Sequence, residues 1–151
     1  MRSKNAIWFE AKVRYQKTME DGVSKNVTET YVVDAMSFSE AEERTIEELS
    51  PYISGEMNVV GLKIASYKEV LFDDVNTIAE QKYFKAKVGL ISIDERTQKE
   101  KVCKYQMLVP ASNIDKVKPC IDEVMSGTMI DYELLSVSDT SIIDVFEYKK
   151  K

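Results

Sequence analysis

Apolar and polar side chains alternate along two stretches, one near the start of the chain and one just past its middle. The apolar positions of the first stretch are Ile7, Phe9, Ala11, Val13 and Tyr15. Those of the second stretch are Phe84, Ala86, Val88 and Leu90. Because successive side chains of a strand point to opposite faces, this alternation predicts two strands that each bury one face.

Each predicted strand is followed by a polar loop and then by a second apolar run. The loops read KTMEDGVSKN at 17–26 and DERTQKEK at 94–101. The runs VTETYVVDA at 27–35 and VCKYQMLVP at 102–110 come next. Strand, polar loop and returning strand together predict two β-hairpins.

Apolar residues then recur at the spacing of a helix after each hairpin. The first set is Phe38, Ala41, Thr45 and Leu49, and the second, 76 residues later, is Ile114, Val117, Ile121 and Met125. Ser37 or Ser39 could cap the first helix, and Glu40 stands three residues after Ser37, as a capping box requires. We expect this helix to end near Leu49. Asp115 is the predicted cap of the second helix, so that Pro119 falls in the first turn, where no amide is needed.

Two similar phrases follow the predicted helices, SGEM at 54–57 and SGTM at 126–129. Glycine is favoured past a helix end because it adopts the left-handed conformation without a steric cost. A further strand-like run then closes each half, at 60–72 and 132–146, and both runs end in Phe.

The order of these elements predicts an internal duplication of a β-β-α-β unit, and WFEAKV at 8–13 matches YFKAKV at 83–88. We expect an α+β fold in which two helices pack on one face of an antiparallel sheet, with a pseudo-twofold between the halves. The repeats are predicted at 1–72 and 83–151, around one shared core. The linker at 73–82 could form a helical turn.

The composition, with 44% hydrophobic and 31% charged residues, is typical of a folded domain. No apolar run reaches the length of about 18–20 residues that a membrane-spanning helix needs, so we expect a cytoplasmic protein without a membrane partner. The spacing of Cys103 and Cys120 favours two buried free thiols.

The chain contains no histidine, which excludes nucleophile systems that depend on a histidine base. Its five glycines form no phosphate-binding loop. Asp73 and Asp74 are the densest carboxylate pair, which could bind a metal in an enzyme or cap a strand end, and the cap is favoured. We therefore expect a protein without enzymatic activity, cofactor or metal.

The second face of each predicted first strand carries the candidate binding residues. Both faces start with an aromatic residue and continue with two cations: Trp8, Lys12 and Arg14 in the first half, and Tyr83, Lys85 and Lys87 in the second. Aromatic rings that stack bases beside cations that contact phosphates are typical of proteins that bind single strands. We predict a single-stranded nucleic acid as the partner, although the net charge is −5.

An alternative interpretation remains for the same residues. Lysine and arginine are common on the solvent face of a strand, and Trp8 and Tyr83 could cover the ends of the core. With eight Tyr in the chain, a protein-interaction or assembly module that binds a protein partner or forms a homodimer is the second hypothesis.

The runs WFEAKVRYQKTMEDG, TETYVVDAMSFSEAE, PYISGEM and SGTMIDY resemble the DUF4494 family of small uncharacterised proteins. The resemblance spans essentially the whole chain, and it is most specific from Trp8 to Ala41. It implies a setting in Bacteroidetes and in their phages and mobile elements, and therefore favours a role in DNA metabolism. It implies no catalytic residues.

Overall fold

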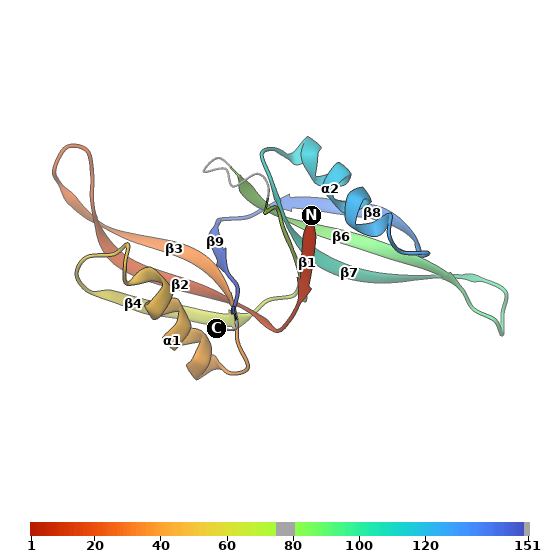
Figure 1. The fold of residues 1–151 in the computed structure, drawn as a ribbon, viewed down its shortest axis with the longest axis horizontal. Helices are drawn as coiled ribbons and strands as arrows, with labels where there is room; N and C mark the ends of the chain where they lie inside the picture. Colours follow the sequence, from red (N-terminus) through yellow and green to blue (C-terminus); the bar gives the residue numbers. More distant parts are fainter. Residues whose placement is uncertain (75–80, 150–151) are drawn as a thin grey trace. The chain divides into compact units, whose positions relative to one another are not determined.

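The computed structural model describes residues 1–74 and 81–149, which form two compact units (Figure 1). The N-unit comprises Ala6–Ala65 and Ser141–Lys151, and the C-unit comprises Met1–Asn5 and Ser66–Thr140. Within the described residues, no helix is long and apolar enough to cross a membrane. The α+β class is confirmed, but each unit has its own sheet and its own α-helix.

The N-unit has a four-stranded sheet in the order β4-β2-β3-β9. β2 pairs antiparallel with both β3 and β4, whereas β9 runs parallel to β3. The helix α1 packs against β2, β3 and β4. Its elements are β2 (Trp8–Thr18), β3 (Ser24–Asp34), α1 (Phe38–Leu49), β4 (Met57–Ile64) and β9 (Ile142–Phe146).

The C-unit has a five-stranded sheet in the order β1-β5-β7-β6-β8. β6 pairs antiparallel with β7 and β8, while β5 runs parallel to β7 and antiparallel to β1. Its strands are β1 (Arg2–Asn5), β5 (Glu69–Phe72), β6 (Lys82–Ile93), β7 (Glu100–Ala111) and β8 (Asp131–Asp139). A 3-10 turn, η1 (Ile114–Lys116), leads into α2 (Val117–Met125), which packs on β7.

The predicted apolar faces form the two cores, with three exceptions. In the N-unit, Phe9, Ala11 and Val13 are buried, as are Ala41, Thr45 and Leu49 of α1. In the C-unit, Phe84, Ala86 and Val88 pack in one cluster with Val117, Ile121 and Met125. Three residues of the predicted apolar faces are exposed: Ile7, Phe38 and Ile114. Each of them precedes or begins its element, at a position where the helix does not cover the sheet.

Both sheets have a register shift at comparable positions. The pairing of β2 with β4 shifts between Lys12 and Val13, and that of β6 with β8 shifts between Lys87 and Val88. Each shift inserts one unpaired residue, Val60 in β4 and Leu135 in β8, as in a β-bulge. The two hairpins and their third strands therefore share this irregularity as well as their order.

The last strand of each predicted repeat lies in the other half's sheet. β5, from the first half, pairs with β7, and β9, from the second half, pairs with β3. The predicted boundaries at 1–72 and 83–151 therefore do not coincide with the two units. The prediction of one antiparallel sheet is also wrong, because there are two sheets, and β5 runs parallel to β7 and β9 runs parallel to β3. The pseudo-twofold and the shared core stay predictions.

The helix ends agree with the predictions made from the sequence only in the first half of the chain. The Ser37 side chain accepts a hydrogen bond from the Glu40 amide at 3.1 Å, and the amide of Met36 donates to the Glu40 carboxylate at 3.0 Å. Gly55 has the expected positive φ of 98°, whereas Gly127 does not adopt a positive φ. The 3-10 turn precedes α2, so Asp115 is not its cap, although Pro119 does lie in the first turn. Most of the predicted linker, 75–80, lies outside the described residues.

Candidate functional site

The second face of the N-unit sheet is polar and basic. Lys12 and Arg14 are exposed on β2, whereas the residues that alternate with them are buried beneath α1 or half-buried. In register with Lys12 are Thr30 on β3 and Gly61 on β4. In register with Arg14 are Thr28 and Asn58. The two cations are thus surrounded by hydroxyl and amide side chains.

The cations of this face differ in their electrostatic partners. Lys63 on β4 forms an ion pair at 3.4 Å with Glu10, which precedes Lys12 by two residues on β2. Lys12 and Arg14 have no ion pair with any residue that the structure describes. The hydrocarbon stem of Lys12 lies over Gly61, where a Cβ would be 3.5 Å from the Lys12 side chain. The Lys12 stem thus packs along β4 at Gly61, at a distance where a Cβ would make an ordinary van der Waals contact.

The C-unit sheet carries the second pair of predicted cations. Lys85 and Lys87 are half-buried on β6. The Lys85 ammonium lies over the Tyr67 ring, 5.8 Å from its centroid. Lys87 is in register with Gln106 on β7 and Ser136 on β8. As in the N-unit, the near neighbours of the cations on this face are largely uncharged.

The two aromatic residues are not placed as expected. Trp8 has 0% of its surface exposed, and its backbone carbonyl accepts a hydrogen bond from the Ala65 amide at 2.8 Å. A ring that is buried in this way offers no face to a base. The prediction that Trp8 stacks bases is therefore wrong for this structure. Tyr83 is half-buried, and its carbonyl accepts from the Thr140 hydroxyl at 2.6 Å.

The predicted site is divided between the two units. Trp8, Lys12 and Arg14 lie on one strand of the N-unit, and Tyr83, Lys85 and Lys87 lie on one strand of the C-unit. Within each unit the two cations share a sheet face. The structure thus has one face with two cations on each unit.

A hollow of about 320 Å³ lies at the end of the N-unit sheet and was not predicted from the sequence. Arg14 connects it to the basic face. The lining is otherwise mostly polar and uncharged, and it comprises Tyr15, Gln16, Asn26, Ser54, Gly55, Glu56 and Asn58 besides Arg14. The only sequence signals were the glycine of SGEM and scattered amide side chains, neither of which is specific.

The hydroxyl of Tyr15, beside this hollow, is already bonded. It donates to the Glu29 carboxylate at 2.5 Å, and Tyr31 donates to the same oxygen at 3.1 Å. Burial, then the hydrogen bond and charge of Glu29, raise the pKa of Tyr15 to about 12. Burial also raises the pKa of Tyr31, with a further contribution from Glu29. Both phenols therefore stay neutral at physiological pH.

The carboxylate pair Asp73 and Asp74 has structural partners. Asp74 accepts two hydrogen bonds from the Arg2 guanidinium, at 2.8 and 3.1 Å. Asp73 lies 3.4 Å from the amide nitrogen of Gln81. In the part of the chain that the structure describes, no group of three or more Cys, Asp or Glu residues could hold a metal ion. Cys103 and Cys120 are free thiols, but Cys103 is exposed and Cys120 is half-buried, so the prediction that both are buried is wrong.

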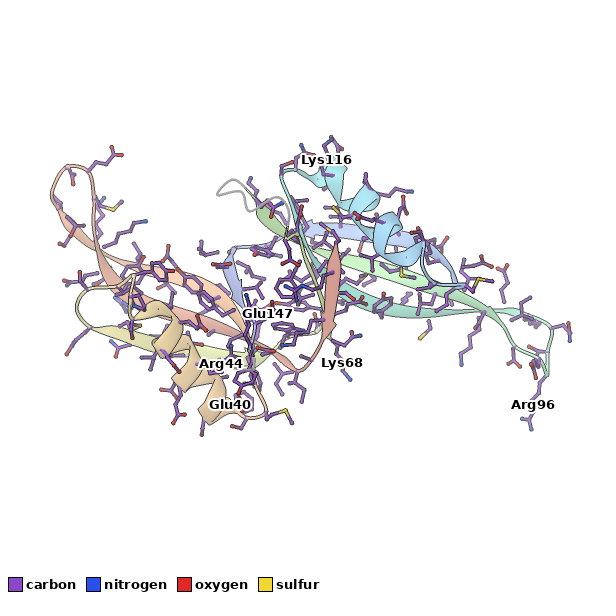
Figure 2. The ribbon with its side chains drawn as sticks, in the orientation of Figure 1. Glu40, Arg44, Lys68, Arg96, Lys116 and Glu147 are labelled. Atoms are coloured by element: carbon purple, nitrogen blue, oxygen red, sulfur yellow. The ribbon has the colours of Figure 1, made fainter. Side chains whose placement is uncertain are left out.

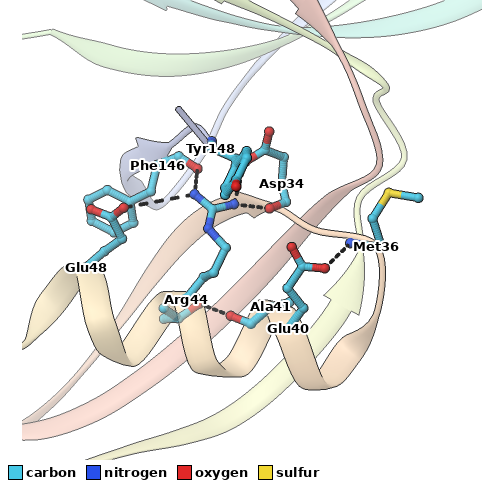
Figure 3. Close-up of polar contacts among 9 residues, drawn as sticks. Asp34, Met36, Glu40, Ala41, Arg44, Glu48, Phe146 and Tyr148 are labelled. Atoms are coloured by element: carbon cyan, nitrogen blue, oxygen red, sulfur yellow. Dashed lines mark hydrogen bonds and ion pairs between the residues drawn. The ribbon is translucent and has the colours of Figure 1, made fainter. Parts of the chain in front are cut away.

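A buried ionic cluster in the N-unit was also missed from the sequence, since Arg44 lies among surface glutamates of α1. Its guanidinium donates to the carbonyl of Asp34 and, at 2.6 Å, to the Asp34 carboxylate (Figure 3). It also reaches the Phe146 carbonyl at 3.5 Å and lies over the Tyr148 ring. The Tyr148 amide donates to Asp34 at 2.7 Å. The cluster thus connects α1 and β3 to the segment that follows β9, and we assign it a structural role.

Comparison with known proteins gives one match. The family described as "Domain of unknown function (DUF4494)" matches residues 7–148, nearly the whole chain. The match includes both sheets except β1, both helices and all six predicted site residues. No curated protein and no solved structure matches the chain.

Proposed function

The chain belongs to the DUF4494 family, and because that family has no known function, we propose from the chain's own residues that it binds single-stranded nucleic acid without enzymatic activity. The strand's phosphates contact Lys12 and Arg14 on the N-unit face, and Lys85 and Lys87 on the C-unit face. A role in the DNA metabolism of a phage or mobile element is part of this proposal.

One observation carries the proposal: in each unit, two cations two residues apart lie on the face of one strand that is opposite to the face covered by the α-helix. Phosphates of a single strand are regularly spaced anions, and cations along a groove or face follow such a backbone without reading its sequence. Thr28, Thr30 and Ser136 add hydroxyls that can donate to phosphate oxygens.

The separation of charge within the N-unit also supports it. α1, on the other side of the sheet, carries five glutamates and Arg44, and the guanidinium of Arg44 is buried. Figure 2 shows Glu40 and Arg44 on this helix. Screening limits the influence of exposed charges to about 10 Å, so an acidic helix and a basic sheet face coexist in one small unit.

The burial of Trp8 changes the expected mode of binding. Without a stacking ring on the N-unit, affinity there comes mainly from phosphate contacts, and Tyr83 is the remaining aromatic candidate on the C-unit face. Stacking contributes about 1–3 kcal/mol per base where it occurs. We therefore expect weaker and more salt-sensitive binding than an aromatic platform would give.

Fluorescence anisotropy with a labelled oligonucleotide of about 15 thymidines tests the proposal. For single strands, the logarithm of the binding constant falls with that of the salt concentration by about 0.7 per phosphate contact. The double variant K12A/R14A should lower affinity and reduce this slope by about 1.4, because two contacts are lost. K85A/K87A should have the same effect.

The matched control is K116A/K118A, which removes two exposed lysines at the start of α2 and changes the net charge equally. In this control, the slope of the logarithm of the binding constant against that of the salt concentration should equal the slope of the wild type. A slope that drops equally in all three variants would show that only overall charge matters. Absence of binding at low salt would exclude the proposed function.

The features that the two units share support a second part of the proposal, that the chain is an internal duplication. Tyr31 and Val32 pair with Asp144 and Val145 of the exchanged strand β9. At the corresponding positions, Met107 and Leu108 pair with Glu69 and Val70 of β5. A duplicated unit that exchanges its last strand would retain the register of both pairings.

A protein-interaction module remains the second candidate, because the C-unit face becomes apolar beyond Lys87. Ile91, Ile93 and Val102 lie there, and Ile93 and Val102 are 67% and 43% exposed. This candidate predicts a mass that increases with concentration in light scattering, and a loss of that increase in I93S/V102S. It predicts no binding of the oligonucleotide.

A further inference from the structure

We propose that the hollow beside Arg14 binds one unpaired guanine base of the bound strand. This inference rests on the proposed function, because the strand on the basic face delivers the base. The hollow is lined by residues of the N-unit alone. Its volume of about 320 Å³ falls within the range of ligand pockets, about 300–1,000 Å³.

The hollow exists because β2 is longer than its neighbour β4. β4 begins at Met57, which is in register with Tyr15, whereas β2 continues to Thr18 with β3 as its partner. Gln16 therefore lies beside the sheet edge with no residue of β4 opposite it. The loop before β4 turns at Gly55, whose positive φ of 98° brings Ser54 and Glu56 to the wall. Backbone groups of β2 at this edge are available to a ligand.

The lining chemistry favours a base over a phosphate. Arg14 and Glu56 are its only charged residues, so the lining has no net charge. A carboxylate would repel a phosphate, whereas a base presents both donors and acceptors on one planar edge. The amides of Gln16, Asn26 and Asn58 can each donate and accept, which matches such an edge.

Guanine fits the two charged groups better than the other bases do. Its O6 and N7 atoms are adjacent acceptors, the edge that an arginine contacts in bidentate fashion. Its N1–H and N2–H₂ groups are adjacent donors, for which a carboxylate is the matching acceptor. Adenine lacks the paired acceptors, and thymine and cytosine lack the paired donors. Arg14 and Glu56 thus give the hollow its selectivity.

The neighbouring cation fixes the path of the strand. Lys12 lies two residues before Arg14 on the same face and has no ion pair among the described residues. A phosphate on Lys12 can leave the next base free to enter the hollow. Glu56 lines the hollow and is not part of the basic face, so its substitution separates selection at the hollow from binding at the face.

Fluorescence anisotropy compares three labelled oligonucleotides of equal length: one of thymidines only, one with a single central dG and one with a single central dA. Bidentate base contacts discriminate by about tenfold or more, so we expect the dG strand to bind about ten times more tightly than the thymidine strand. The dA strand should bind like the thymidine strand. In Glu56→Gln, which loses the carboxylate acceptor for N1–H and N2–H₂ but keeps Arg14, the dG preference should fall well below that of the wild type.

The matched control is Glu47→Gln, which removes an exposed carboxylate of α1 outside the hollow and should retain the tenfold preference. Circular dichroism checks that both variants fold. Salt-sensitive binding of all three strands with equal affinity would overturn the guanine site and leave the proposed function intact. An equal increase in affinity for the dG strand and for the dA strand, relative to the thymidine strand, would also overturn the guanine site. Absence of binding to any strand would exclude the proposed function, and the guanine site with it.

Discussion

Gly89 occupies a position on β6 where the neighbouring side chains leave no room for a methyl group. A Cβ there would lie 2.9 Å from a Val102 methyl and 3.3 Å from a Leu135 methyl. Gly89→Ala should therefore destabilise the protein by about 1–3 kcal/mol, the usual cost of overpacking. Urea denaturation measures this change.

Gly127→Ala is the control for this substitution, since its Cβ would meet no atom within 4 Å and its φ is not positive. It should leave the free energy of unfolding within about 0.5 kcal/mol of the wild type. Equal effects at both positions would show that the Val102 contact does not constrain β6.

Arg44 is the residue whose loss should cost most. Both Arg44 and Asp34 are buried, and Arg44→Met would leave the Asp34 carboxylate without its cation. Breaking a buried ion pair from one side costs about 3–5 kcal/mol, which urea denaturation can measure. The exposed pair of Lys118 and Asp122, 3.0 Å apart, provides the comparison. Lys118→Met should cost less than about 1 kcal/mol, and similar losses in the two variants would contradict the role assigned to the Arg44 cluster.

The ionisation of the Tyr15 hydroxyl makes the stability of the N-unit depend on pH in the alkaline range. Burial, with the Glu29 hydrogen bond and charge, raises its pKa to about 12 in the folded protein, against about 10 in the unfolded chain. Its neutral form therefore contributes stability that is complete below about pH 10 and is lost as the pH rises through about 12. The ultraviolet absorbance of tyrosinate follows this ionisation. Glu29→Gln should move part of the titration to lower pH, and an unchanged curve would contradict the assignment.

At the scale of the element, the start of α1 is fixed by a side chain that the sequence identified. Ser37 accepts from the Glu40 amide, so Ser37→Ala should destabilise the protein by about 1 kcal/mol. Asn113, which precedes η1, makes no side-chain capping bond. Asn113→Ala should thus have little effect in the same urea measurement. A larger loss at Asn113 than at Ser37 would contradict this account of the helix ends.

The elements also show what local pattern can and cannot predict. The hairpins, the helices and their buried faces were predicted because periods of two and of 3.6 residues are local properties of the chain. The division of 60–72 into β4 and β5, and of 132–146 into β8 and β9, was not predicted. β1 was missed as well, because its four residues show no apolar alternation.

The candidate site was predictable to a similar extent. Alternation placed Lys12 and Arg14 on the exposed face of β2, as the structure has them. It also placed Trp8 there, although Trp8 is buried, because alternation assigns a residue to a face and cannot tell what covers that face. The hollow at Arg14 depends on where β4 begins relative to β2, and the Arg44 cluster depends on contacts with residues at the far end of the chain. Neither arrangement has a local signature.

At the scale of the whole molecule, the exchange of β5 and β9 determines how the halves depend on each other. Each sheet needs a strand from the other half of the chain, and the Arg44 cluster also requires the segment after β9. The pairing of β5 and β9 joins distant segments, which explains why the predicted repeats do not coincide with the units.

This dependence leads to a prediction for a protein cut between its halves. With a protease site placed within 75–80, the fragments 1–74 and 81–151 should stay associated after cleavage, because each supplies a strand to a sheet of the other. Size-exclusion chromatography would show a single species, and circular dichroism should show that the isolated fragments are less ordered than their mixture. The shorter fragment 81–140 lacks β9, so it should bind 1–74 more weakly. Fragments that separate and remain fully folded would show that the exchanged strands contribute little, and that each half holds its fold without the other.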